Sequence, residues 1–300
     1  MKIASKLIWQ SDEVCELGEN PLWDIEASTL YWIDIVNPAI FTWSGGAVVR
    51  YPIPKPVASI YLARPGHLLV ALRSALVWLD LATGATAPVD GAWPLSADER
   101  FNDGRCDCQG VIWISTMDRH LKTDIGSIVR IASSKDHRVF PSHAVLGNGV
   151  CFSPDDRFLY FSDTHRRVIH RYNKNALEDG HTLAGELFVR ADAGVGKPDG
   201  CTVDSDGCLW SVSIGGGCIE RYSPEGRLIG ILDLPVSHPT HCTFGGPDMR
   251  TLFVTTASYS RLSPALAGQP LAGRILGFDV TIQGMSEHRL TKNLENEYAQ

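Results

Sequence analysis

The chain has 300 residues, of which 44% are hydrophobic, and its formal net charge is −7. This length and apolar content can bury a sizeable core, so we expect one domain over residues 1–300. The acidic balance and the lack of a basic stripe argue against nucleic acid as a partner. No apolar run reaches the roughly 18 residues of a membrane helix, and no signal peptide is predicted.

Six similar phrases recur along the chain, at intervals of about 40 to 50 residues. They begin at Glu19, Ala58, Asn102, Asn148, Asp199 and Thr240. Each is followed by a turn rich in Asp, Gly or Pro and then by two runs of β-branched and aromatic residues, which is typical of strands. The first runs are 30–34, 68–72, 112–116, 159–163, 209–213 and 252–256, and the second runs are 40–43, 76–79, 128–131, 169–172, 219–222 and 275–278.

Repeats of this size and content predict an all-β fold, a six-bladed β-propeller whose blades surround a central channel. We expect residues 6–10 to complete the blade that contains Ile275, so that both termini share one sheet. The longer inserts at 94–101, 120–124 and 258–272 are expected to be loops crowning one face. No long stretch has a helical period.

The eight cysteines include no Cys-x-x-Cys spacing, and a chain this long does not need disulfides. Cys151, Cys201 and Cys242 take similar places just inside their repeats, where a small apolar residue would pack. We therefore predict core thiols and a cytoplasmic, reducing compartment.

Four of the six phrases carry an oxygen-bearing residue at one shared offset, namely Glu19, Asn102, Asn148 and Asp199. Because the innermost strand of each blade lines the channel, these side chains should converge at one mouth. Carboxylate and amide oxygens suit hard or intermediate divalent cations, and the lack of thiolate disfavours structural zinc. The alternative is that Asn-Gly and Asp-Gly mark ordinary hairpin turns.

Three other features are assigned to structure rather than to chemistry. Gly215–Gly217 precedes a strand and is read as a hairpin turn. Asp204-Ser-Asp-Gly begins like a calcium loop, but its twelfth position is Gly215, which has no side chain to ligate. His241 lies one position past Thr240. We expect it to pack in the core, and the alternative is that it reaches the channel mouth.

The ordered motifs resemble the signatures of the senescence marker protein/gluconolactonase/regucalcin family. They are Gly18-Glu19-Asn-Pro-Leu-Trp, Arg100-Phe-Asn102-Asp-Gly-Arg, Ser115-Thr-Met117, Asn148-Gly, Pro198-Asp199-Gly and Phe244-Gly-Gly. The resemblance implies a six-bladed propeller with one divalent metal ion in the channel, and hydrolysis of sugar lactones. It implies Glu19, Asn148 and Asp199 as metal ligands, and it assigns Arg100 and Asn102 to the substrate. Ca²⁺ is placed first, with Zn²⁺, Mn²⁺, Mg²⁺ and Fe²⁺ as alternatives.

A mechanism follows for opening a glucono-, xylono- or arabinonolactone. The metal would act as a Lewis acid on the carbonyl, and Asp199 would be the catalytic base. Some family members carry an acidic pair where this chain has Asp118-Arg119-His120, so His120 is a candidate substrate ligand and the sugar is the open question.

Two other functions compete with the sugar lactonase. Related calcium propellers that hydrolyse phosphotriesters present Glu, Asn, Asn and Asp in the same order. A propeller that binds calcium without catalysis is the third hypothesis, although Arg100 and Asn102 favour a polyhydroxylated substrate. The expected partner is a small-molecule sugar lactone, with the protein a monomer or weak oligomer.

Overall fold

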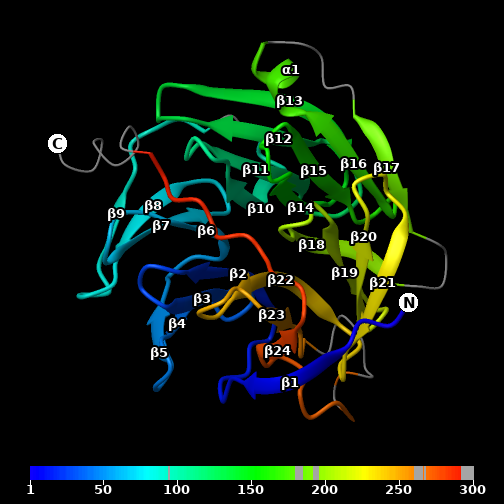
Figure 1. Ribbon diagram of the computed structural model, residues 1–300. Coiled ribbons are helices and arrows are strands. Elements are labelled where there is room, and N and C mark those ends of the chain that lie inside the picture. Colours follow the sequence, from blue (N-terminus) through cyan, green and yellow to red (C-terminus); the bar gives the residue numbers. More distant parts are fainter. Residues whose placement is uncertain (94, 180–184, 192–195, 260–265, 267, 292–300) are drawn as a thin grey trace.

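The computed structural model describes residues 1–93, 95–179, 185–191, 196–259, 266 and 268–291. Its strands form six four-stranded antiparallel sheets arranged around one axis (Figure 1). The innermost strands contact one another in a closed ring, in the order β2, β6, β10, β14, β18 and β22. The predicted six-bladed all-β propeller is therefore confirmed.

Each blade is a meander of four strands. Blade 1 contains β2 (Gly18–Asp24), β3 (Thr29–Asp34), β4 (Ala39–Trp43) and β5 (Val49–Pro52), and blade 2 contains β6 (Val57–Leu62), β7 (His67–Leu72), β8 (Leu76–Asp80) and β9 (Thr86–Pro88). Blade 3 contains β10 (Glu99–Cys106), β11 (Ile112–Asp118), β12 (Gly126–Ile131) and β13 (His137–Ala144), and blade 4 contains β14 (Gly147–Phe152), β15 (Phe158–Asp163), β16 (Val168–Asn173) and β17 (Glu186–Arg190). Blade 5 contains β18 (Lys197–Val203), β19 (Leu209–Ile214), β20 (Cys218–Tyr222) and β21 (Leu228–Asp233), and blade 6 contains β22 (Pro239–Gly245), β23 (Thr251–Thr256), β24 (Leu276–Val280) and β1 (Ser5–Gln10).

Blade 6 closes the ring with strands from both ends of the chain. β1 pairs antiparallel with β24, from Ser5 opposite Val280 to Gln10 opposite Leu276. The prediction that the N-terminal strand completes this sheet is confirmed.

An aspartate after the inner strand explains the recurring turns. The Oδ1 atom of Asp107 accepts the backbone N–H of Val111 at 2.9 Å, while its Oδ2 accepts Trp113 Nε1–H at 3.0 Å. Asp204 repeats this arrangement, with Cys208 N–H at 2.9 Å and Trp210 Nε1–H at 2.7 Å. One carboxylate thus fixes the turn and orients the indole of the next strand, so Asp204 serves a turn, as the sequence predicted.

The blade cores contain the residues that the pattern placed there. Trp32, Trp113 and Trp210 are fully buried between strands, as are Cys201 and Cys242, and Cys151 is nearly so. The eight cysteines are free thiols, and only Cys108 is exposed. No helix among the described residues is long and apolar enough to cross a membrane.

Two features of the fold differ from the predictions made from the sequence. The insert expected at 94–101 ends earlier, because β10 begins at Glu99 and Arg100 is therefore an inner-strand residue. One short helix, α1 (Lys174–Glu178), was not predicted; Asn173 caps it by accepting the N–H of Ala176 at 3.1 Å. The expected loop at 120–124 does lie between strands, whereas much of the 258–272 insert lies outside the described residues.

The segment after β24 crosses the end of the channel at which the inner strands finish (Figure 1). Gly284 N–H donates to Met249 O at 2.8 Å, and Leu290 N–H donates to Leu62 O at 2.9 Å. The chain itself therefore covers this end of the channel, which we call the lower end. The opposite end, at which the inner strands begin, is called the mouth.

Candidate active site

Bulges in the inner strands turn the predicted site residues toward the axis. The pairing of each inner strand with its neighbour shifts between Glu19 and Leu22, between Phe101 and Gly104, between Asn148 and Cys151, and between Pro198 and Cys201. A bulge interrupts the strict alternation of side chains and re-aims the residue that it contains. Glu19, Asn102, Asn148 and Asp199 each lie at such a shift, which is why four residues of one offset share the mouth.

The amide of Asn148 is held in one orientation by its neighbours. Its Nδ2 donates to Thr164 Oγ1 at 2.9 Å, and the Thr164 hydroxyl donates in turn to Pro198 O at 2.7 Å. The amide oxygen therefore faces the channel, where Asn102 Nδ2 donates to it at 2.5 Å. An oxygen so presented is suited to a cation.

The two carboxylates of the mouth have few partners. Glu19 Oε2 accepts only the adjacent N–H of Asn20, at 3.0 Å, and the carboxylate of Asp199 accepts no hydrogen bond from the described residues. Burial raises the pKa of Glu19 well above its ordinary value, and the negative charges of Asp199 and Asp103 raise it further. Burial likewise raises the pKa of Asp199, with Asp103 adding to the effect. Ionising both carboxylates together is therefore costly unless a cation lies beside them.

This donor set fits a hard divalent cation. Among the residues described, no group of three or more His, Cys, Asp or Glu side chains is arranged to hold a metal; the candidate set here is two carboxylates and one amide. Oxygen ligands of this kind suit Ca²⁺ and similar ions, and three of them leave coordination positions for water and substrate. A bound cation would also relieve the repulsion between the two carboxylates.

Arg100 and Asn102 form a polar chain beside these carboxylates. Arg100 Nη1 donates to Phe101 O and to Asn102 Oδ1, both at 3.0 Å, and Asn102 Nδ2 donates to Gly147 O at 2.9 Å. Burial lowers the pKa of Arg100 to about 10, Arg73 and Arg119 lower it, and Glu19 opposes them. The guanidinium is still charged at neutral pH.

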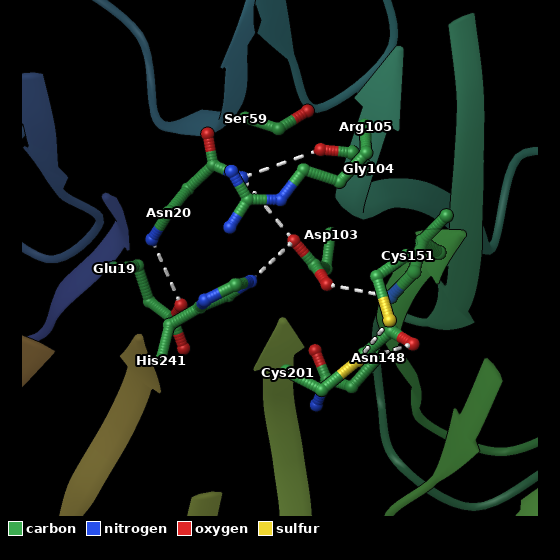
Figure 2. A network of polar contacts seen from close by, with 12 residues as sticks. Glu19, Asn20, Ser59, Asp103, Gly104, Arg105, Asn148, Cys151, Cys201 and His241 are labelled. Carbon is green, nitrogen blue, oxygen red and sulfur yellow. Dashed lines mark hydrogen bonds and ion pairs between the residues drawn. The ribbon is translucent and has the colours of Figure 1, made fainter. Parts of the chain in front are cut away.

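A second polar layer lies beneath the mouth, around Asp103 (Figure 2). Its Oδ1 accepts Asn20 Nδ2–H at 3.2 Å and lies 3.3 Å from His241 Nε2, while its Oδ2 accepts Val150 N–H at 3.0 Å. Burial opposes ionisation of Asp103, but the charge and hydrogen bond of His241 outweigh it, and the pKa falls to about 2. One carboxylate thus joins four blades directly under the site.

Sequence reasoning missed this layer. His241 is fully buried, as its predicted packing required, but its Nδ1 lies 2.8 Å from Cys242 N and 3.0 Å from Cys242 O, so Nε2 is the ring nitrogen that faces Asp103. The Gly of the Asp199-Gly phrase makes room for this ring, because a Cβ at Gly200 would lie 2.1 Å from it. The sequence held two signals of this contact, the glycine and the position of His241 one residue past Thr240.

His120 lies on the rim rather than in the channel. Its side chain is 63% exposed, and Nε2 is 3.6 Å from Asp98 Oδ1. The loop is shaped by Asp118, whose carboxylate accepts the backbone N–H groups of His120, Lys122 and Thr123. No hydrogen bond joins His120 to Arg100 or Asn102, so its contact with substrate stays a prediction.

Residues 17–258 match the model of the SMP-30/Gluconolactonase/LRE-like region. The chain belongs to this family. Among its relatives, a 6-deoxy-6-sulfogluconolactonase of Pseudomonas putida is 34% identical over 90% of this chain and 94% of its own. A pentonolactonase of Haloferax volcanii is 31% identical, over 93% and 96%. The solved structure of regucalcin from Agrobacterium tumefaciens, described as a calcium-binding protein, has a TM-score of 0.87 at 26% identity and covers 95% of this chain and 98% of its own. The family predicted from the motifs is confirmed.

Proposed function

We propose that this member of the SMP-30/gluconolactonase family hydrolyses the ester of a sugar lactone at the channel mouth, with the aid of a divalent cation. The observation that carries the proposal is the meeting of two carboxylates, which contact no cationic side chain among the described residues, with one oriented amide oxygen beside Arg100 and Asn102. The relatives named above support the reaction, because two of them are lactonases.

Glu19, Asn148 and Asp199 would hold the ion. When bound, it would supply a Lewis acid for the lactone carbonyl, a term worth several kcal/mol in related chemistry. We place Ca²⁺ first, which the regucalcin structure, described as that of a calcium-binding protein, supports. Zn²⁺, Mn²⁺, Mg²⁺ and Fe²⁺ are the alternatives, since each accepts carboxylate oxygen.

The chain's own residues would transfer the proton and bind the lactone. Asp199 would take the proton of the attacking water, because it is the carboxylate with no hydrogen-bond donor to compete for its lone pairs among the described residues. Arg100 would fork onto a hydroxyl or the carbonyl of the lactone, and Asn102 would fix that guanidinium through its 3.0 Å bond. Ring opening by water requires no covalent enzyme intermediate.

The substrate would be a pentono- or hexonolactone such as a glucono-, xylono- or arabinonolactone, and His120 would contact it from the rim. The free state of all eight cysteines supports a reducing compartment such as the cytoplasm. We propose that the protein is a monomer or a weak oligomer.

The test is an assay of chelator-treated protein against a panel of γ- and δ-aldonolactones, after reloading with each of the five ions. We expect turnover of at least one lactone with at least one ion, and little without any. Hydrolysis of a phosphotriester in place of every lactone would favour the competing hydrolase. Tight Ca²⁺ binding with no turnover of either class would leave the non-catalytic propeller.

A further inference from the structure

A hollow with a volume of about 420 Å³ opens beside the mouth. Its lining includes Arg73, Trp93, Ser96, Ala97, Glu99 and Arg119. These residues follow β7, precede or begin β10, and follow β11, which are the strand ends that face the mouth. The hollow and the candidate metal ligands therefore open at the same end of the propeller.

The charge of this hollow is not balanced by its own acidic residue. Glu99 is already engaged, since Ser96 N–H donates to its Oε2 and Thr116 Oγ1–H donates to its Oε1, both at 3.0 Å. Arg119 Nη1 donates to the carbonyl of Ala97 at 3.1 Å, and neither Arg119 nor Arg73 forms an ion pair with a described residue. Two guanidinium groups and one carboxylate thus line the hollow, and its formal charge is positive.

Backbone hydrogen bonds tie both arginines to the strand that carries Arg100. The N–H of Phe101 donates to Arg73 O at 2.8 Å, and the N–H of Arg119 donates to Asp98 O at 2.8 Å. Besides burial, the positive charges of Arg73 and Arg119 lower the pKa of Arg100, whereas the negative charge of Glu19 raises it. Arg100 therefore links the hollow to the carboxylates of the mouth.

We propose that the hollow, with Arg73 and Arg119, binds a sulfonate, phosphate or carboxylate group on the part of the lactone remote from its ester, so that the preferred substrate is an anionic sugar lactone. The inference rests on the proposed lactonase function and names its substrate class. A guanidinium fork matches the oxygens of such groups, and the excess positive charge of the hollow attracts an anion to it. The alternative is that Arg73 and Arg119 are ordinary solvated surface residues. Against this, they line a concave hollow together with Trp93 and Ser96.

The test compares two lactones that differ only in the terminal group, a hydroxyl in one and a sulfonate in the other, with a phosphate-bearing lactone as a third arm. For the wild-type enzyme we expect the ratio of kcat/KM, anionic over neutral, to exceed unity and to fall as salt is raised from about 0.05 to 0.5 M. In Arg73→Gln and Arg119→Gln the ratio should fall about 10- to 100-fold. Arg227→Gln is the matched control, because Arg227 is exposed and pairs with Glu225 on an outer turn of blade 5.

The phosphate and sulfonate arms show which anion the hollow prefers, and either preference supports the proposal. Equal kcat/KM values for the neutral and anionic lactones in the wild-type enzyme would overturn it, as would an unchanged ratio in both arginine variants. In each of those cases the lactonase function stands. Failure to hydrolyse any of the lactones would instead overturn the proposed function, together with this inference.

Discussion

At the lower end of the channel the guanidinium of Arg105 is buried and lies 2.5 Å from Glu287 Oε1, a residue of the segment that crosses there. Thr243 Oγ1–H donates to the same carboxylate at 2.8 Å. At the mouth, neither Glu19 nor Asp199 contacts a cationic side chain among the described residues, and burial raises the pKa of both. The chain therefore pairs its buried charge at the closed end of the channel. At the open end it leaves two carboxylates available to a ligand.

The contrast separates stability from function. A buried charge is tolerated when it is paired, and an unpaired one costs free energy unless something outside the chain supplies the partner. Perturbed carboxylates in a concave site are accordingly candidates for catalysis or ion binding. Each of the following substitutions should affect one end of the channel without affecting the other.

Asp199→Asn should have the largest effect. Removal of the proposed base and ligand should lower kcat/KM for a lactone about 10²- to 10⁴-fold. The melting temperature should hold or rise, because a like-charge repulsion disappears. Asp206→Asn, on an exposed turn, is the control, and a fully active Asp199→Asn enzyme would contradict the assignment.

Glu287→Gln should act on stability instead. Removing one partner of a buried ion pair typically costs about 3–5 kcal/mol, so the free energy of unfolding should fall by that order. The folded fraction should keep its kcat. Chemical denaturation and a lactone assay on the same sample measure both; an effect on kcat larger than that on stability would contradict the separation of the two ends.

Arg100→Lys should have the next largest effect. Lysine keeps the positive charge but not the planar fork that donates to Phe101 O and Asn102 Oδ1. We expect kcat/KM to fall about 10- to 100-fold with little change in melting temperature. Activity equal to that of the wild type would show that charge alone suffices at this position.

Asp103→Asn tests the layer beneath the mouth, with the smallest expected effect. The pKa of Asp103 is lowered to about 2 in the folded protein, so its ionised form stabilises the fold above about pH 4, and this contribution is lost as the pH falls toward 2. At neutral pH the loss should be on the order of 2 kcal/mol. Unfolding measured from pH 7 to pH 3 should show wild type and variant converging at low pH. Parallel curves would contradict the depressed pKa.

The repeat made much of this predictable. Glu19, Asn148 and Asp199 share an offset, and the strands after them alternate clearly, so their convergence could be predicted from the sequence. The Asp103–His241 contact could not, because it depends on how the bulges rotate two residues that lie one position past that offset. The hollow of Arg73 and Arg119 also escaped the pattern, since it is assembled from segments of two blades.

The central claim is that the open end of the channel takes up a divalent cation that the closed end does not need. Calorimetric titration of metal-stripped protein with Ca²⁺, followed by a lactone assay on the same sample, tests it most directly, with Glu19→Gln and Glu287→Gln side by side. We predict one ion per chain and restored hydrolysis for the wild type and for Glu287→Gln, with binding weakened at least about tenfold in Glu19→Gln. Full lactone hydrolysis by rigorously metal-free protein, or uptake of Ca²⁺ that Glu19→Gln does not weaken, would contradict the account.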